Sequence, residues 1–172
     1  MTLEKRLQTF SDRRVALLDE VEALDHGVLV AKPLPGKWSI LEVVEHLVLA
    51  ERAVFRGMPE PARLVAKERR LGHRVRYLLV MLVLKLRIRV RVPSAAMIPQ
   101  GNHSLAELRR FWEENQDWLR SCIDHLGSEI GRKAVFKHPV SGPLTVEQAV
   151  RMAQIHLDGH IRQIRRLRAR VR

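Results

Sequence analysis

The sequence has little that could support covalent cross-linking, membrane insertion or export. It contains one cysteine, Cys122, in 172 residues, which excludes an internal disulfide framework and suits a reducing compartment. Its longest apolar run, Leu78 to Leu84, is far shorter than the roughly 20 residues of a membrane-spanning helix. The N-terminal segment MTLEKRLQTFSDRR has no apolar signal core, so we expect no export. We therefore predict a cytoplasmic protein without a transmembrane segment, in which residues 1–172 form a single domain.

Acidic and aromatic residues are also scarce. The chain has 19 Asp and Glu against 31 Lys and Arg, a formal net charge of +12. The excess is concentrated between Arg63 and Arg91, where Glu68 is the only acid, and in the Arg-rich tail after His160. Tyr77 is the only aromatic residue in these two stretches that could stack on a base. Two interpretations stay open: a solvated basic surface, or a surface that steers anionic substrates or weakly binds a polyanion.

Apolar residues recur every three or four positions along most of the chain, which is typical of amphipathic helices. This periodicity predicts four long helices, over residues 3–28, 39–56, 104–126 and 145–172. The second and third helices each begin with an S-x-x-E capping box, Ser39 with Glu42 and Ser104 with Glu107. Residues 136–143 are rich in turn formers and predict an irregular connection. The predicted fold class is all-α, a four-helix bundle with a long crossover connection between helices 2 and 3.

The crossover itself shows mixed patterns. Residues 61–86 are typical of one long basic helix, whereas residues 86–92 alternate apolar and basic side chains as a short strand does. Pro93 and Pro99 then favour an extended chain up to the third helix of the bundle.

The predicted last helix carries two histidines on its apolar stripe. That stripe contains, in order, Val146, Ala149, Ala153, His156, His160, Ile164, Leu167 and Val171. Residues four apart lie on the same side of a helix, so His156 and His160 can direct their rings at one point. A buried imidazole needs a hydrogen bond or a metal ion, and one shared ion would satisfy both rings. Spacing alone does not decide between two buried histidines that have hydrogen-bond partners in the core and two histidines that bind a metal ion.

His46 in the second helix is the third candidate, at the edge of its own apolar stripe. Three neutral imidazoles around one divalent ion, with a further position open, are typical of a catalytic rather than a structural metal site. Glu42 lies one helical turn before His46. Its carboxylate could accept a hydrogen bond from the second ring nitrogen of His46 or act as a base. The alternative role of Glu42 is the capping box.

The other histidines and the cysteine carry no predicted chemistry. These histidines lie at helix ends, in basic stretches or in a loop, and are His26, His73, His103, His125 and His138. Cys122 falls on an apolar stripe near a helix C-terminus, a position that raises a thiol pKa. We therefore expect Cys122 to be an inert core residue.

Three stretches of the chain resemble the motifs of a known family. KWSILEVVEHLVLAE, residues 37–51, resembles the first metal motif of the DinB-like superfamily, a group also described as YfiT-like metal-dependent hydrolases. HPVSGPLT, residues 138–145, resembles the G-x-L-T helix start of that family, and HLDGHIRQI, residues 156–164, resembles its closing H-x-x-x-H helix. These stretches occur in the order that the family pattern has.

The resemblance implies a bundle whose long crossover brings the second and fourth helices together. It also implies that His46, His156 and His160 bind one divalent transition metal such as zinc or nickel, and that Trp38 packs before the first motif. Activities associated with the family include transfers and isomerisations that use a low-molecular-weight thiol. The cationic stretch over residues 63–91 departs from the family pattern, so the residues that face a substrate stay unassigned.

We hypothesise a metal-dependent hydrolase or thiol-dependent transferase that acts on a small-molecule substrate in a pocket at one end of the bundle. The alternative is a non-enzymatic basic helical protein that binds nucleic acid or an anionic surface. A third hypothesis is a bundle that retains the metal site without turnover. A homodimer is compatible with a helical bundle, and the sequence does not test it.

Overall fold

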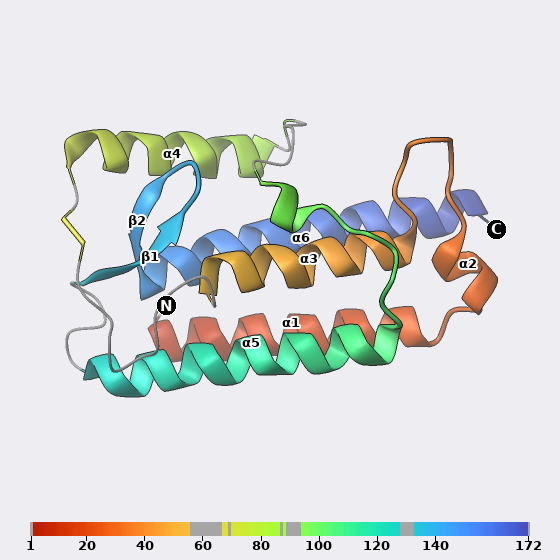
Figure 1. Ribbon diagram of the computed structural model, residues 1–172, viewed down its shortest axis with the longest axis horizontal. Coiled ribbons are helices and arrows are strands. Elements are labelled where there is room, and N and C mark those ends of the chain that lie inside the picture. Colours follow the sequence, from red (N-terminus) through yellow and green to blue (C-terminus); the bar gives the residue numbers. More distant parts are fainter. Residues whose placement is uncertain are drawn as a thin grey trace.

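Four long helices form the body of the protein. The computed structural model describes residues 2–55, 67–68, 70–86, 88, 94–127 and 133–171. The bundle helices are α1 (Leu3–Glu22), α3 (Ile40–Phe55), α5 (Leu105–Leu126) and α6 (Val146–Val171). α1 packs on α6, α6 on α3, and α3 on α5, in two layers of two helices (Figure 1). The predicted all-α four-helix bundle is confirmed.

The connection between α3 and α5 is the predicted long crossover. It contains α4 (Leu71–Leu86) and the short 3-10 helix η2 (Ala95–Met97). α4 lies outside the bundle, packed on α6 and on the strand β2 (Gly142–Thr145), while η2 lies against α3 (Figure 1). None of the helices in the described part of the chain combines the length and apolar character that crossing a membrane requires.

The predicted helix over residues 61–86 is confirmed only from Leu71 onwards. Lys67 and Glu68 are not helical, and the Lys67 N–H donates to the Ala134 carbonyl at 2.9 Å. This long-range backbone bond replaces the local one that Lys67 would have made in a helix. Arg70 is not helical either, so the prediction was wrong at these three residues. Residues 61–66 lie outside the described residues, as do 87 and 89–92 of the strand-like segment.

The first predicted helix is two helices in the structure. α1 ends at Glu22, and α2 (His26–Val30) starts after Asp25, whose carbonyl accepts from the Val28 and Leu29 N–H groups. The apolar stripe continues through the break, because Leu24 and Val28 still pack against the core. A continuous stripe therefore did not reveal the change of helix direction.

The predicted irregular connection before α6 is a β-hairpin, which corrects that expectation. β1 (Ala134–His138) pairs antiparallel with β2, from Ala134 opposite Thr145 to His138 opposite Gly142. An irregularity between Ala134 and Phe136 leaves three successive residues of β1 buried. The alternation that identifies a strand in a sequence is therefore missing here.

The core agrees with the predicted stripe of α6, of which Val146, Ala149, Ile164 and Leu167 are buried. In α5, Trp112 is the fully buried aromatic residue, next to Asn115, Leu119 and Cys122. The capping box of Ser104 and Glu107 starts α5 as predicted. Burial raises the pKa of Cys122 to about 12, so its thiol stays protonated and inert as expected.

Candidate metal centre

α6 directs two imidazoles at the same point. The helix begins as predicted at Thr145, whose hydroxyl accepts from the Gln148 N–H while the Gln148 side chain accepts from the Thr145 N–H. His156 and His160 lie one turn apart, with their Nε2 atoms 3.0 Å from each other. Two imidazole nitrogens at this distance share a proton or bind one ion.

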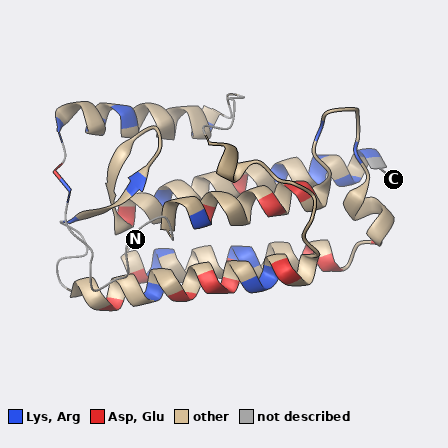
Figure 2. Cartoon of the chain, in the orientation of Figure 1, with Lys and Arg blue, Asp and Glu red and all other residues tan. Residues whose placement is uncertain are grey.

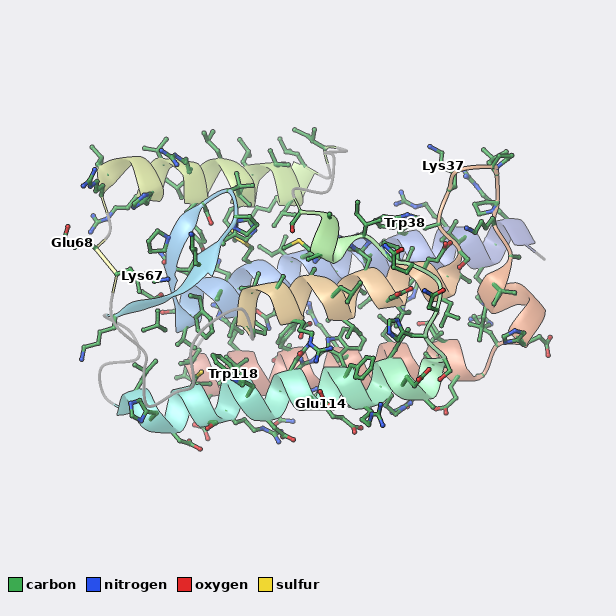
Figure 3. The ribbon with its side chains drawn as sticks, viewed as in Figure 1. Lys37, Trp38, Lys67, Glu68, Glu114 and Trp118 are labelled. Atoms are coloured by element: carbon green, nitrogen blue, oxygen red, sulfur yellow. The ribbon has the colours of Figure 1, made fainter. Side chains whose placement is uncertain are left out.

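α3 adds the third imidazole from the neighbouring helix. The ring centroid of His46 lies 5.3 Å from that of His156 and 5.0 Å from that of His160. One ring nitrogen from each of the three lies within 4.8 Å of the others. Trp38, labelled in Figure 3 just before α3, covers His46 at a centroid distance of 4.9 Å. The three histidines that the sequence singled out do meet.

Hydrogen bonds hold the outer nitrogen of two of these rings. The Nδ1–H of His46 donates to the Met97 carbonyl at 2.7 Å, which leaves Nε2 with a free lone pair. The Nδ1 of His160 lies 2.9 Å from the Gln163 Oε1 atom. Hydrogen bonds of this kind orient metal-binding histidines and fix their tautomer.

Burial keeps all three imidazoles neutral. It lowers the pKa of His46, only partly offset by the hydrogen bond to Met97, and it lowers the pKa of His160 to about 4. The pKa of His156 is held well below its ordinary value by burial first and then by the nearby imidazoles. Neutral imidazole is the form that binds a metal ion.

The donor set fits a divalent transition ion. A tetrahedral zinc ion with Zn–N bonds of about 2.0–2.1 Å separates its nitrogen ligands by about 3.3 Å. The separation between the Nε2 atoms of His156 and His160 is already close to that value. Since the three ring nitrogens lie within 4.8 Å of one another, the ring of His46 needs to move only a short way to bind the same ion. Three imidazoles, with no thiolate or carboxylate in the cluster, suit zinc, nickel or copper better than magnesium or calcium.

A buried carboxylate that the sequence did not single out supports this arrangement. Glu45, 1% exposed, accepts from the Gln100 and Gly101 N–H groups at 3.1 and 2.8 Å, and its Oε1 atom lies 2.9 Å from His103 Nδ1. These bonds fasten the segment that follows η2 onto α3. The same segment carries the Met97 carbonyl to which His46 donates.

Glu42 has partners of its own at the start of α3. Its carboxylate accepts from the Ser39 N–H at 2.7 Å and from Lys32 Nζ at 2.8 Å, and the Ser39 hydroxyl completes the capping box. Burial alone would raise its pKa, but the hydrogen bonds from Lys32 and Ser39 hold the pKa below its usual value. The second nitrogen of His46 donates to Met97 instead. A role for Glu42 beside the metal stays a prediction.

Two histidines without predicted chemistry lie near this centre. His138 is close enough to His156 to lower its pKa. Its Nδ1 atom accepts from the Val140 and Ser141 N–H groups in the hairpin turn. His103 contacts Glu45. Neither role could be predicted from the sequence, because each depends on contacts between segments that are far apart or on the fold of the hairpin.

Two hollows on the described surface are lined by residues other than the three histidines. One of about 270 Å³ lies between α1 and α6, where Arg13 pairs with Asp158 and Arg165 with Glu20. Another of about 170 Å³ lies between α4 and α6, beside Tyr77. The substrate pocket that we expected at the end of the bundle stays a prediction.

Comparison with known proteins identifies the family. The model of the family described as the DinB superfamily matches residues 9–164, which include the bundle and all three histidines. No curated protein matches the chain.

Proposed function

The chain belongs to the DinB superfamily, and we propose on this basis that it is a metal-dependent enzyme with a three-histidine centre. His46, His156 and His160 are the proposed ligands of one divalent ion. The observation that carries this proposal is the approach of three ring nitrogens, from two helices, to within 4.8 Å of one another. Zinc and nickel are the metals that the family resemblance implies, and three imidazole ligands suit both.

The reaction we propose is hydrolysis or the transfer of a low-molecular-weight thiol to a small-molecule substrate. When bound, a divalent ion supplies Lewis-acid chemistry that can activate either water or a thiol for attack. Three neutral ligands suit that task, because they leave the full double charge of the ion in place. The ligand set supports both reactions equally.

The protein residues contribute orientation and exclusion of water. Met97 and Gln163 hold the outer nitrogens of His46 and His160, so that these rings are turned toward the centre before an ion arrives. Trp38 covers one side of His46, whose own exposed fraction is only 5%. The burial of His46 lowers the local dielectric on its side of the centre, which strengthens the electrostatic effect of a charge held there.

The first test is the metal content of protein purified from metal-replete medium. We expect one divalent ion per chain in the unaltered protein and a loss of that ion in His160→Ala. His125→Ala is the matched control, because His125 is an exposed histidine near the end of α5. An unchanged metal content in His160→Ala would show that the ligand assignment is wrong.

The second test separates the two reactions. Metal-loaded and metal-stripped protein are compared on a panel of hydrolysable esters and amides, and on an electrophile offered with several small thiols. Turnover that requires both metal and one thiol assigns a transferase, whereas turnover without thiol assigns a hydrolase. If the loaded and stripped proteins have the same rates, the proposed metal dependence is wrong.

A further inference from the structure

The outer face of α4 carries a continuous apolar stripe. Six large apolar residues on it are each between 50% and 75% exposed: Leu71, Val75, Leu78, Leu79, Leu82 and Leu86. Their spacing of three and four places them along one side of the helix. α4 forms one long edge of the molecule, and its side chains project outward from it (Figures 1 and 3).

This stripe differs from the other exposed apolar residues that the structure describes. Those residues lie singly on different elements, as Val15 does on α1, Leu34 in a loop and Val140 in the hairpin turn. Scattered residues of this kind are ordinary on a soluble surface, whereas a contiguous apolar face marks an interaction site.

Attachment of α4 to the bundle does not need the stripe. The opposite side of the helix supplies Tyr77 and Met81, both buried, with Val80 and Leu84 partly buried against the core. That inner side packs on α6 and β2. The six residues of the stripe are therefore not explained by packing against the described part of the chain, in which Leu78 and Leu82 border only the hollow beside Arg151 of α6.

Basic side chains border the stripe on both sides. Arg74 and Lys85 lie along one edge and Arg76 along the other, all exposed, and α4 contains no acidic residue. Figure 2 shows α4 in tan and blue only, whereas α1 and α5 mix both signs. No ion pair with a described residue holds these three cations, unlike Arg165 and Arg168 of α6, which pair with Glu20.

We propose that the outer face of α4 is a docking surface for an anionic lipid bilayer, with the helix lying in the plane of the interface. A leucine stripe between two basic borders is the pattern of a helix that buries its apolar face among the lipid headgroups while its cations contact anionic lipid. A second copy of the chain fits less well, because pairing two such helices brings their cations together. Nucleic acid fits less well too, because the outer face has no aromatic side chain for stacking.

The test is sedimentation of the full chain with lipid vesicles. We expect binding to vesicles of equal parts phosphatidylcholine and phosphatidylglycerol, and much weaker binding to phosphatidylcholine alone. Leu78→Gln/Leu82→Gln is expected to weaken binding to the mixed vesicles by about tenfold or more. Arg74→Gln/Arg76→Gln/Lys85→Gln is expected to weaken it by up to about a hundredfold, since each cation near an anionic surface raises binding about fivefold.

The matched control is Val15→Gln/Leu34→Gln, which removes two exposed apolar residues from other elements. It should bind the mixed vesicles as the unaltered chain does. Circular dichroism and metal content should match the unaltered protein in every variant, because none of these side chains lies in the core or the metal centre. In hydrogen exchange, vesicles should protect α4 in the unaltered chain.

Four results would overturn the proposal. The first is absence of binding to the mixed vesicles. The second is binding that Leu78→Gln/Leu82→Gln leaves unchanged, which would assign the attraction to net charge alone. The third is a dimer that becomes a monomer in that variant without any vesicle binding, which would assign the stripe to a second copy. Binding to a DNA duplex without binding to vesicles would count against it equally.

Discussion

Removal of the Glu45 carboxylate should weaken both the fold and the metal centre. In Glu45→Ala the Gln100 and Gly101 N–H groups lose their acceptor in a partly buried position. Each such loss costs about 1–2 kcal/mol. The imidazole of His103, with 32% of its side chain exposed, can turn to water and adds little. We therefore expect the free energy of unfolding to fall by about 2–4 kcal/mol.

The same change should lower zinc affinity, because the released segment carries the carbonyl that orients His46. Loss of a hydrogen bond behind a metal ligand typically costs about 10–100-fold in affinity. Urea unfolding of the metal-free protein measures the first effect, and competition with a chromophoric zinc chelator measures the second. Relative to Glu45→Ala, Glu45→Gln should restore part of both effects, since its amide oxygen can accept from one of the two N–H groups while its amide nitrogen cannot accept from the other.

Glu107→Ala is the matched control for this pair of measurements. Its carboxylate caps the start of α5, directly after the connection that contains residues 97–101, and makes no bond to those residues. It should cost some stability and leave zinc affinity unchanged. If Glu45→Ala lost stability while its zinc affinity stayed within about twofold of the unaltered protein, the link between Glu45 and His46 would be refuted.

Three further predictions concern residues around the core and the centre. Arg14 and Glu51 form a buried ion pair at 2.8 Å; Arg14→Met or Glu51→Leu alone should cost about 3–5 kcal/mol in urea unfolding, and the double variant should recover most of it. Burial lowers the pKa of His138 to about 4, so between that pH and about 6.5 the unfolded chain binds more protons than the folded one. The free energy of unfolding should therefore decrease as the pH is lowered across this range, by about 3 kcal/mol at most. In His138→Gln the free energy of unfolding should decrease less steeply with pH. Glu42→Ala should weaken the cap at Ser39 by about 1 kcal/mol without loss of metal, and loss of metal would instead support its predicted role beside His46.

Local signals were sufficient to predict the four bundle helices and two of the three histidines that the structure brings together. The capping boxes and the spacing of apolar residues depend on neighbours within one or two turns, so Ser39, Ser104 and the pair His156 and His160 could be found from the sequence. His46 could be joined to that pair only through the family resemblance. Spacing within one helix does not show which other helix it will contact.

The parts that the sequence did not reveal depend on contacts between distant segments. Glu45 is 55 and 56 residues from the two N–H groups that it accepts from, and Met97 is 51 residues from His46. The hairpin was missed because both sides of β1 are covered and its alternation is lost. The apolar run in α4 can be found in the sequence, but only the packing of Tyr77 and Met81 in the structure shows which side of the helix stays exposed.

The central claim is that three imidazoles bind one metal ion, and X-ray absorption at the zinc edge of zinc-loaded protein tests it most directly. We predict nitrogen neighbours at about 2.0–2.1 Å, with the outer-shell scattering of three imidazole rings. His46→Ala should reduce that outer-shell signal by one ring. A sulfur neighbour at about 2.3 Å, or fewer than three rings in the unaltered protein, would contradict the assignment of His46, His156 and His160.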